Sequence, residues 1–185
     1  MRMFNRLTTR AAAPSVLVAA LALTGQLAAA QSAAGAPAKT SKATAITTCS
    51  TAHTRLTVTP VTRPVNHLLL KATNTGTQPC YAYGAPYLRA GADAQAAVAW
   101  NDSTVPQAVV TLAPGESAYA GITTSTPEGS EGHTAKTLGV LFSNRAMNGS
   151  VGVEKTLQLP AGGTYFNSAA TVTYWQDNID NALFD

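Results

Sequence analysis

The side chains that could do chemistry in this chain of 185 residues are few and far apart in the sequence. The three histidines are His53, His67 and His133. No two of them are spaced so that one strand face or one helical turn would present both to a metal ion. A hydrolase nucleophile would stand in a Gly-x-Ser-x-Gly turn, and Gly115–Tyr119 lacks the second glycine of that pattern. We therefore predict no catalytic residue, no metal site and no cofactor.

The acidic residues leave one enzymatic alternative open. A glycosidase needs two carboxylates across a cleft, and the carboxylates of this chain are scattered over loop-like segments and its end. A hydrolase would require some of them to converge with His67 or His133 in the fold. The stretch Asp177–Asp180 lacks the spacing of a calcium-binding loop, so it predicts an exposed acidic end.

Aromatic side chains are the remaining candidates for a binding site. Tyr81 and Tyr83 are two residues apart and share one face of the strand predicted there, whereas Tyr174 and Trp175 face opposite sides. Exposed rings could stack on sugars or on a partner protein, and the other interpretation is that they fill the core and its rim. We keep Tyr81, Tyr83 and Trp175 as candidate binding residues.

Residues 1–30 have the three parts of a cleavable secretory signal peptide. The positive start consists of three arginines, Arg2, Arg6 and Arg10. An apolar stretch follows at Ala11–Leu23, and three alanines come just before Gln31. This apolar run is shorter than the roughly 20 residues of a membrane-spanning helix. We predict cleavage between Ala30 and Gln31, a secreted mature chain and no stable insertion into a membrane.

The predicted signal peptide carries the whole net charge of the chain. The sequence has 12 Lys plus Arg against 9 Asp plus Glu, and three of the basic residues lie within residues 1–30. The mature chain is therefore neutral. A neutral chain lacks the basic surface that binds nucleic acid or an anionic membrane. An extracellular protein or a cell-wall glycan remains as the expected partner, and we expect a monomer.

Cys49 and Cys80 are the only cysteines, and both lie in the exported part. They do not form a Cys-x-x-Cys motif, and neither has a histidine at a zinc-like spacing. An even number of cysteines in an oxidising compartment predicts a disulfide, and a monomer allows only this pairing. On the chain-entropy model, closing a loop of about 30 residues stabilises a fold by roughly 3–4 kcal/mol.

The mature chain divides into a leader and one domain. Residues 31–48 contain one large apolar residue, Ile46, so they predict a flexible leader. From residue 49 to 185, short alternating runs rich in Thr, Val, Leu and Tyr predict strands. These strands are Arg55–Thr59, His67–Thr73, Cys80–Tyr83, Ala97–Trp100, Gln107–Leu112, Ser117–Thr123, Thr137–Ser143, Glu154–Leu159 and Thr171–Trp175.

Turn residues separate the predicted strands, among them Gly84–Pro86 and Asn148-Gly149. After the signal peptide, no stretch of ten or more residues has the period of a helix. Many short strands at this spacing favour an all-β, antiparallel β-sandwich, with a small barrel as the alternative.

Three segments of the predicted domain, taken in order, carry a family resemblance. They are Leu68–Gly76, which ends in Asn-Thr-Gly, Cys80–Pro86, which ends in Gly-Ala-Pro, and Val110–Ala118, which contains Leu-Ala-Pro-Gly. Together with Cys49, they resemble the domain-of-unknown-function 4232 family, whose members are secreted or lipoprotein-type proteins, mostly of actinobacteria. The resemblance implies an immunoglobulin-like sandwich and no assigned activity. Members often carry a second cysteine pair near the C-terminus, and this chain has none.

The expected function follows from export and from the lack of an active-site pattern. We predict a secreted, non-enzymatic β-sandwich module with a binding or structural role in the cell envelope or outside the cell. The alternatives are a carbohydrate-binding module, an enzyme inhibitor and, less directly, a hydrolase. An inhibitor would act through Thr124–Lys136, the longest polar connection in the domain.

Overall fold

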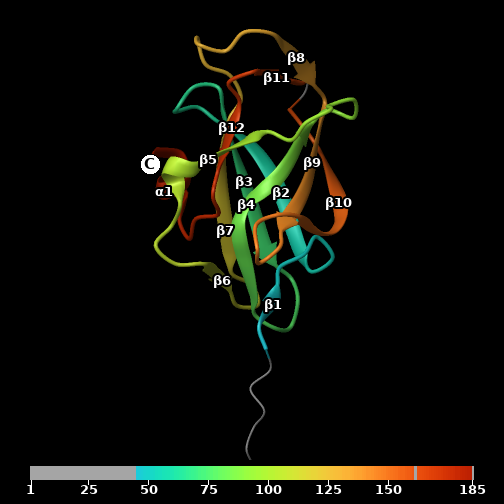
Figure 1. Cartoon of the computed structure of the whole chain (residues 1–185), viewed down its shortest axis with the longest axis vertical. Helices are drawn as coiled ribbons and strands as arrows, with labels where there is room; N and C mark the ends of the chain where they lie inside the picture. The colour runs from blue at the N-terminus through green and yellow to red at the C-terminus, as the bar shows by residue number, and fades with distance from the viewer. Residues whose placement is uncertain (1–44, 161, 185) are drawn as a thin grey trace, which may run out of the picture. The chain divides into compact units, whose positions relative to one another are not determined.

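Nearly all regular structure in the computed structural model is β-strand (Figure 1). The model describes residues 45–160 and 162–184. The strands are β1 (Thr47–Thr48), β2 (Thr54–Val61), β3 (His67–Asn74), β4 (Cys80–Ala90), β5 (Ala99–Asn101), β6 (Val110–Leu112), β7 (Ser117–Thr123), β8 (Gly132–Ala135), β9 (Thr137–Ser143), β10 (Ser150–Gln158), β11 (Thr164–Asn167) and β12 (Thr171–Thr173). Within these residues the helices are a 3-10 turn, η1 (Asp102–Thr104), and α1 (Ile179–Phe184).

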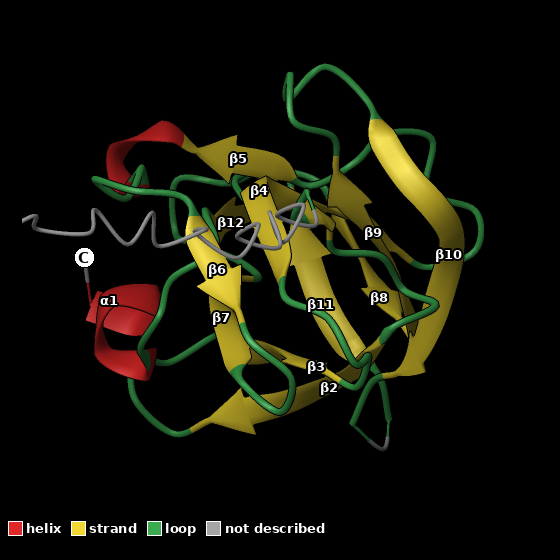
Figure 2. Cartoon of the chain, turned by 90° about the horizontal axis from the view of Figure 1, so that it is seen from below, coloured by secondary structure: helices red, strands yellow, loops and turns green. Residues whose placement is uncertain are grey.

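The strands form a sandwich of two sheets and a small ribbon (Figure 2). The first sheet has the order β1-β4-β9-β10, with β6 also paired to β4. The second has the order β2-β3-β7-β12-β5, and β8 pairs with β11 at the end of the domain opposite β1. Most pairs are antiparallel, as expected, and two short pairs, β1 with β4 and β5 with β12, are parallel. The expected all-β, immunoglobulin-like sandwich is confirmed.

The core forms because alternate residues of the strands are apolar. In β3 every second side chain is buried, and Leu68 and Leu70 lie opposite Ile122 and Ala120 of β7. The first sheet contributes its own buried side chains, among them Phe142. Burying each large aliphatic side chain contributes about 1.5–3 kcal/mol, so this alternation fixes the register of the central strands.

The segment Gly84–Pro86, expected to form a turn, lies inside the long strand β4. Tyr83 pairs with Ser143 and Tyr87 with Leu141, so four residues of β4 span two residues of β9. Gly84 has a φ of +57°, a left-handed conformation that glycine adopts without steric cost. The extra residues form a bulge, which is also where a strand tolerates proline.

Two segments expected to be irregular are partly ordered. Thr47 and Thr48 of the predicted leader form β1, so the domain begins before Cys49. The connection Thr124–Lys136 contains β8, which pairs with β11. The predicted signal peptide at residues 1–30, its cleavage point and the leader up to residue 44 lie outside the described residues. No helix within 45–160 and 162–184 is long and apolar enough to cross a membrane.

The acidic stretch leads into the short helix α1, which packs beside β7 (Figure 2). The residues Asp177–Asp180 are exposed as predicted, whereas Ala182 further along the helix is 1 % exposed. The helix can approach because β7 has a glycine there: a Cβ at Gly121 would overlap the carbonyl oxygen of Ala182. The sequence did not predict α1, because a helix of six residues is too short to show the hydrophobic period of a helix.

Replacing Gly121 by alanine should detach α1 from β7. We expect a loss of about 1–3 kcal/mol in the free energy of unfolding, because the added methyl group meets backbone that cannot move aside without the helix. Urea unfolding of the wild-type and variant chains measures this loss. In a chain that ends at residue 176 the same substitution should cost little, and an equal cost in both chains would show that α1 is not responsible.

Candidate functional site

Two of the three segments that carry the family resemblance are joined around Asn74 at one corner of the domain, and the third reaches this corner where Cys80 pairs with Leu112. Asn74 is 2 % exposed. Its backbone N–H donates to the carbonyl oxygen of Glu116 at 2.9 Å, and its own carbonyl accepts from the N–H of Gly115 at 2.8 Å. Its side-chain Nδ2 donates to the carbonyl oxygens of Leu112 and Gln78, both at 2.9 Å. These bonds give the segments a structural role.

The disulfide lies at the same corner. Cys49 and Cys80 are bonded at 2.03 Å, so the predicted pairing is confirmed. The N–H of Cys49 also donates to the carbonyl oxygen of Tyr81 at 2.9 Å, next to the parallel pair of β1 and β4. The bridge therefore fastens the start of the domain to its longest strand. Both cysteines are buried, so the bridge is part of the hydrophobic core.

The outer face of β4 is where aromatic side chains gather. Tyr81, Tyr83 and Tyr87 are partly exposed, while the alternate residues Ala82 and Leu88 are buried. The bulge after Tyr83 keeps all three tyrosines on one face, because it adds an even number of residues relative to β9. The rings of Tyr81 and Tyr83 lie with their centroids 5.6 Å apart.

Two further rings extend this row from other strands. Trp100 of β5 lies with its centroid 4.9 Å from that of Tyr87 and 5.7 Å from that of Tyr174. The indole N–H of Trp100 donates to the carbonyl oxygen of Pro86 in the bulge, at 3.2 Å. The Tyr174 hydroxyl donates to Asp102 at 3.2 Å. We call the five residues Tyr81, Tyr83, Tyr87, Trp100 and Tyr174 the aromatic face.

Trp175 does not belong to the aromatic face, and its selection as a candidate binding residue is wrong. Its side chain is 0 % exposed, and its ring stacks on Phe142 in the core with the centroids 5.2 Å apart. Tyr174 and Trp175 do face opposite sides, and the partly exposed one is Tyr174. The sequence also missed Tyr87 and Trp100. The period of β4 would have found Tyr87 had Gly84–Pro86 been read as a bulge, and no local signal placed Trp100 beside it.

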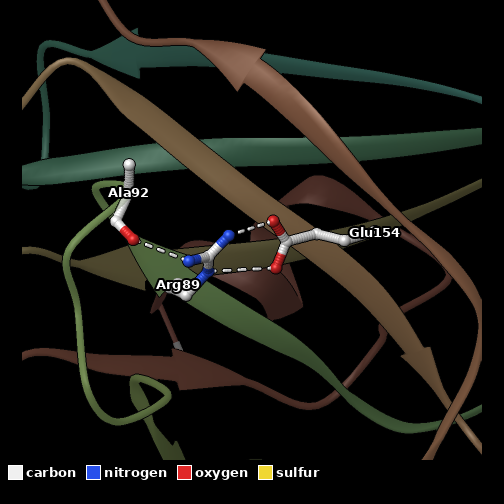
Figure 3. Close-up of polar contacts among 3 residues, drawn as sticks. All are labelled: Arg89, Ala92 and Glu154. Atoms are coloured by element: carbon white, nitrogen blue, oxygen red, sulfur yellow. Dashed lines mark hydrogen bonds and ion pairs between the residues drawn. The ribbon is translucent and has the colours of Figure 1, made fainter.

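Two residues after Tyr87 on β4, Arg89 forms a charged pair with Glu154. Figure 3 shows this pair together with Ala92. Arg89 donates from Nη2 and Nε to the two carboxylate oxygens of Glu154 on β10, at 2.6 and 3.1 Å, and from Nη1 to the carbonyl oxygen of Ala92. The pair crosses β9 at Gly139, where a Cβ would lie 2.5 Å from the Glu154 carboxyl carbon. The hydrogen bonds and the charge of Glu154 raise the pKa of the Arg89 guanidinium. Both charges are thus already paired.

The histidines and carboxylates do not converge in the part of the chain that the structure describes. Nδ1 of His67 donates to the carbonyl oxygen of Val65 at 2.6 Å, and its Nε2 bonds the hydroxyl of Thr123. His133 donates to the carbonyl oxygen of Ala90 at 2.8 Å. Neither ring has a carboxylate partner in these bonds. Among residues 45–160 and 162–184, no three side chains of the metal-binding types come together.

The sequence of the chain matches one protein-family model. The model of a family described as a domain of unknown function, DUF4232, matches residues 49–176. The chain belongs to this family. No curated protein and no solved structure matches the chain.

The DUF4232 match covers both the corner around Asn74 and the aromatic face. All five residues of the aromatic face lie between residues 49 and 176, and α1 lies after the matched range. The segments that carried the resemblance are engaged in hydrogen bonds and the disulfide. Tyr81 and Tyr83 point outward from β4 and lie in Cys80–Pro86, one of the segments that carried the resemblance. Part of the aromatic face therefore lies in that segment.

The Tyr174 hydroxyl offers a direct check of the aromatic face. Partial burial, and then the bond to Asp102, raise the pKa of Tyr174 above its ordinary value of 10.0. Replacing Asp102 by asparagine should lower this pKa, because ionised Tyr174 would no longer face a carboxylate. An NMR or ultraviolet titration of both chains measures it. In the wild-type chain the raised pKa of Tyr174 stabilises the folded state below its ordinary value of 10.0, and this stabilisation is lost as the pH rises through the folded-state pKa. An unchanged pKa in the variant would contradict the Tyr174–Asp102 contact.

Proposed function

We propose that the chain is an exported, non-enzymatic binding module and that the aromatic face is its binding surface. The observation that carries this proposal is the position of the rings. Phe142 and Trp175 fill the core, whereas the five rings of the aromatic face are partly exposed: three lie on the outer side of β4 in the first sheet, and Trp100 and Tyr174 of the second sheet lie next to Tyr87. Tyrosine and tryptophan give large contact areas at a low entropic cost, which favours them in binding surfaces.

Export is supported by the signal-peptide pattern in residues 1–30 and by the disulfide. A bond such as Cys49–Cys80 persists in oxidising compartments and is rare in the cytosol. A mature chain with equal numbers of acidic and basic residues fits a partner other than nucleic acid. We infer that the module works in the cell envelope or outside the cell.

The non-enzymatic part of the proposal rests on the surroundings of the histidines. The hydrogen bonds of His67 and His133 engage carbonyl and hydroxyl oxygens, whereas a general base is usually oriented by a carboxylate. The inhibitor alternative finds less support, because hydrogen bonds and strand pairing hold Thr124–Lys136 against the domain. Asn167 donates to the carbonyl oxygen of Thr126, and β8 pairs with β11.

Retention on insoluble cell-envelope material tests the proposed function. The Tyr83→Ala and Tyr87→Ala chains should be retained several-fold less than the wild-type chain, because each loses one ring of the aromatic face. Tyr165→Ala is the matched control, since Tyr165 is 49 % exposed on β11, away from the aromatic face. Equal retention of all four chains, or no retention of the wild-type chain, would contradict the proposal.

A further inference from the structure

The rings of the aromatic face form two groups, one on β4 alone and one where β4 lies beside β5 and the end of β12. Tyr81 and Tyr83 make the first group, and Tyr87, Trp100 and Tyr174 make the second. The bulge at Gly84–Pro86 separates them. Tyr81 and Tyr87 are six positions apart in the sequence, but the bulge takes up two of them. The two residues are therefore separated by four strand repeats, which is about 13 Å. A ligand that contacts both Tyr81 and Tyr87 must therefore span about 13 Å, as an extended chain does.

On β4 itself the row is one ring wide. Tyr81 lies opposite Thr48 of β1 and Thr111 of β6, and Tyr83 lies opposite Ser143. The loop after β9 borders the bulge, because Met147 packs against Gly84. A protein partner usually covers a broad patch of about 800 Å² on each side. A single file of rings on β4, with the accessible Thr48 and Thr111 beside Tyr81, suits a chain molecule better.

The charges beside the row are already engaged. Arg89 is held by Glu154 and by the carbonyl oxygen of Ala92, and Asp102 accepts the Tyr174 hydroxyl. An ionic ligand would have to displace one of these partners. An uncharged sugar would not, because its C–H face can lie on an aromatic ring while its hydroxyl groups bond the phenol oxygens or water.

We propose that the ligand of the aromatic face is an uncharged polysaccharide chain that lies along β4 and occupies both ring groups. This inference rests on the proposed function, since it names the ligand of the same surface. The two ring groups act as linked subsites, so the second contact is intramolecular once the first has formed. Binding should therefore depend on the length of the sugar chain.

Titration of the mature chain with soluble, uncharged oligosaccharides of increasing length tests this inference. The probes are chitin, cellulose and starch fragments, and calorimetry or tryptophan fluorescence reports binding. For at least one series, we expect the affinity to rise about tenfold or more between the dimer and the longest soluble fragment, as two linked subsites predict. Polygalacturonate, which is anionic, should bind more weakly than the best neutral chain.

One variant in each ring group separates the two subsites. Tyr83→Ala and Trp100→Ala should each lower the affinity for the longest fragment about tenfold, the scale of one lost ring contact. Each should also remove most of the dependence on length. Tyr165→Ala again serves as the control.

The outcomes separate this inference from the proposed function. Affinity without dependence on length, or stronger binding of polygalacturonate, would overturn the uncharged-chain proposal. Retention on cell-envelope material that needs Tyr83 and Tyr87, without binding of any neutral series, would overturn it as well and leave the proposed function standing. In that case a protein partner would be the remaining explanation, and removal of retention by protease treatment of the envelope material would identify it.

Discussion

Replacing Cys49 and Cys80 together by alanine should lower the free energy of unfolding by about 3–4 kcal/mol. The two cysteines are 31 positions apart, so the disulfide restricts a long loop in the unfolded chain. In the folded chain it fastens the start of the domain to β4, beside the hydrogen bonds of Asn74. Urea unfolding of the oxidised wild-type chain and of the double variant measures the difference.

The reduced wild-type chain is the control for the loss of the disulfide. It should unfold at a urea concentration close to that of the double variant, because both lack the cross-link and keep the corner around Asn74. If the oxidised chain and the double variant differed by less than about 1 kcal/mol, the disulfide would not be a main stabiliser of this domain.

Replacing Trp175 by alanine should cost about 3–5 kcal/mol, the range for deleting a large aromatic side chain from a core. The ring is 0 % exposed and stacks on Phe142, between the two sheets. Its indole N–H is buried and has no hydrogen-bond partner among residues 45–160 and 162–184. Trp175→Phe should therefore cost clearly less than Trp175→Ala, because it keeps a ring against Phe142 and removes an unsatisfied donor.

The comparison of the two Trp175 variants also separates the core from the aromatic face. Trp175→Phe should leave ligand retention unchanged, since Trp175 takes no part in the binding surface. Equal losses of stability for the alanine and phenylalanine variants would contradict the packing described here, and a loss of retention in a stably folded Trp175→Phe chain would contradict the limits of the aromatic face.

The central strands could be predicted from the sequence because their own residues determine them. The predicted bounds Ser117–Thr123 and Thr137–Ser143 match β7 and β9 residue for residue. In these strands apolar and small or polar residues alternate between flanking turn residues, so period and composition agree. The pairing of Cys49 with Cys80 was also predictable, since the chain has no other cysteine.

The aromatic face could be predicted only in part because distant segments build it. Tyr81 and Tyr83 followed from the alternation of one strand. Trp100 and Tyr174 meet because β5 pairs with β12 in parallel, a contact between residues more than 70 positions apart. The bulge in β4 depends on a partner from the same distant segments, because the backbone N–H of Trp175 donates to the carbonyl oxygen of Gly84. A local reading of Gly and Pro there predicts a turn instead.

The corner around Asn74 explains why the family motifs by themselves said little about function. Gly76, Gly115 and Glu116 hydrogen-bond to Asn74 through their backbones. Residues of this kind determine how a fold is held, whereas recognition depends on side chains that remain accessible. The outward tyrosines of β4 meet that requirement.

The most direct test of the central claim is an NMR titration of the isotope-labelled mature chain with solubilised cell-envelope glycans. The account predicts that chemical-shift changes concentrate on the aromatic face, at the Trp100 indole N–H and at the backbone amides of Tyr81, Tyr83, Tyr87 and Tyr174. Changes concentrated on Thr124–Lys136, on the disulfide corner or on β2 and β3 would contradict it.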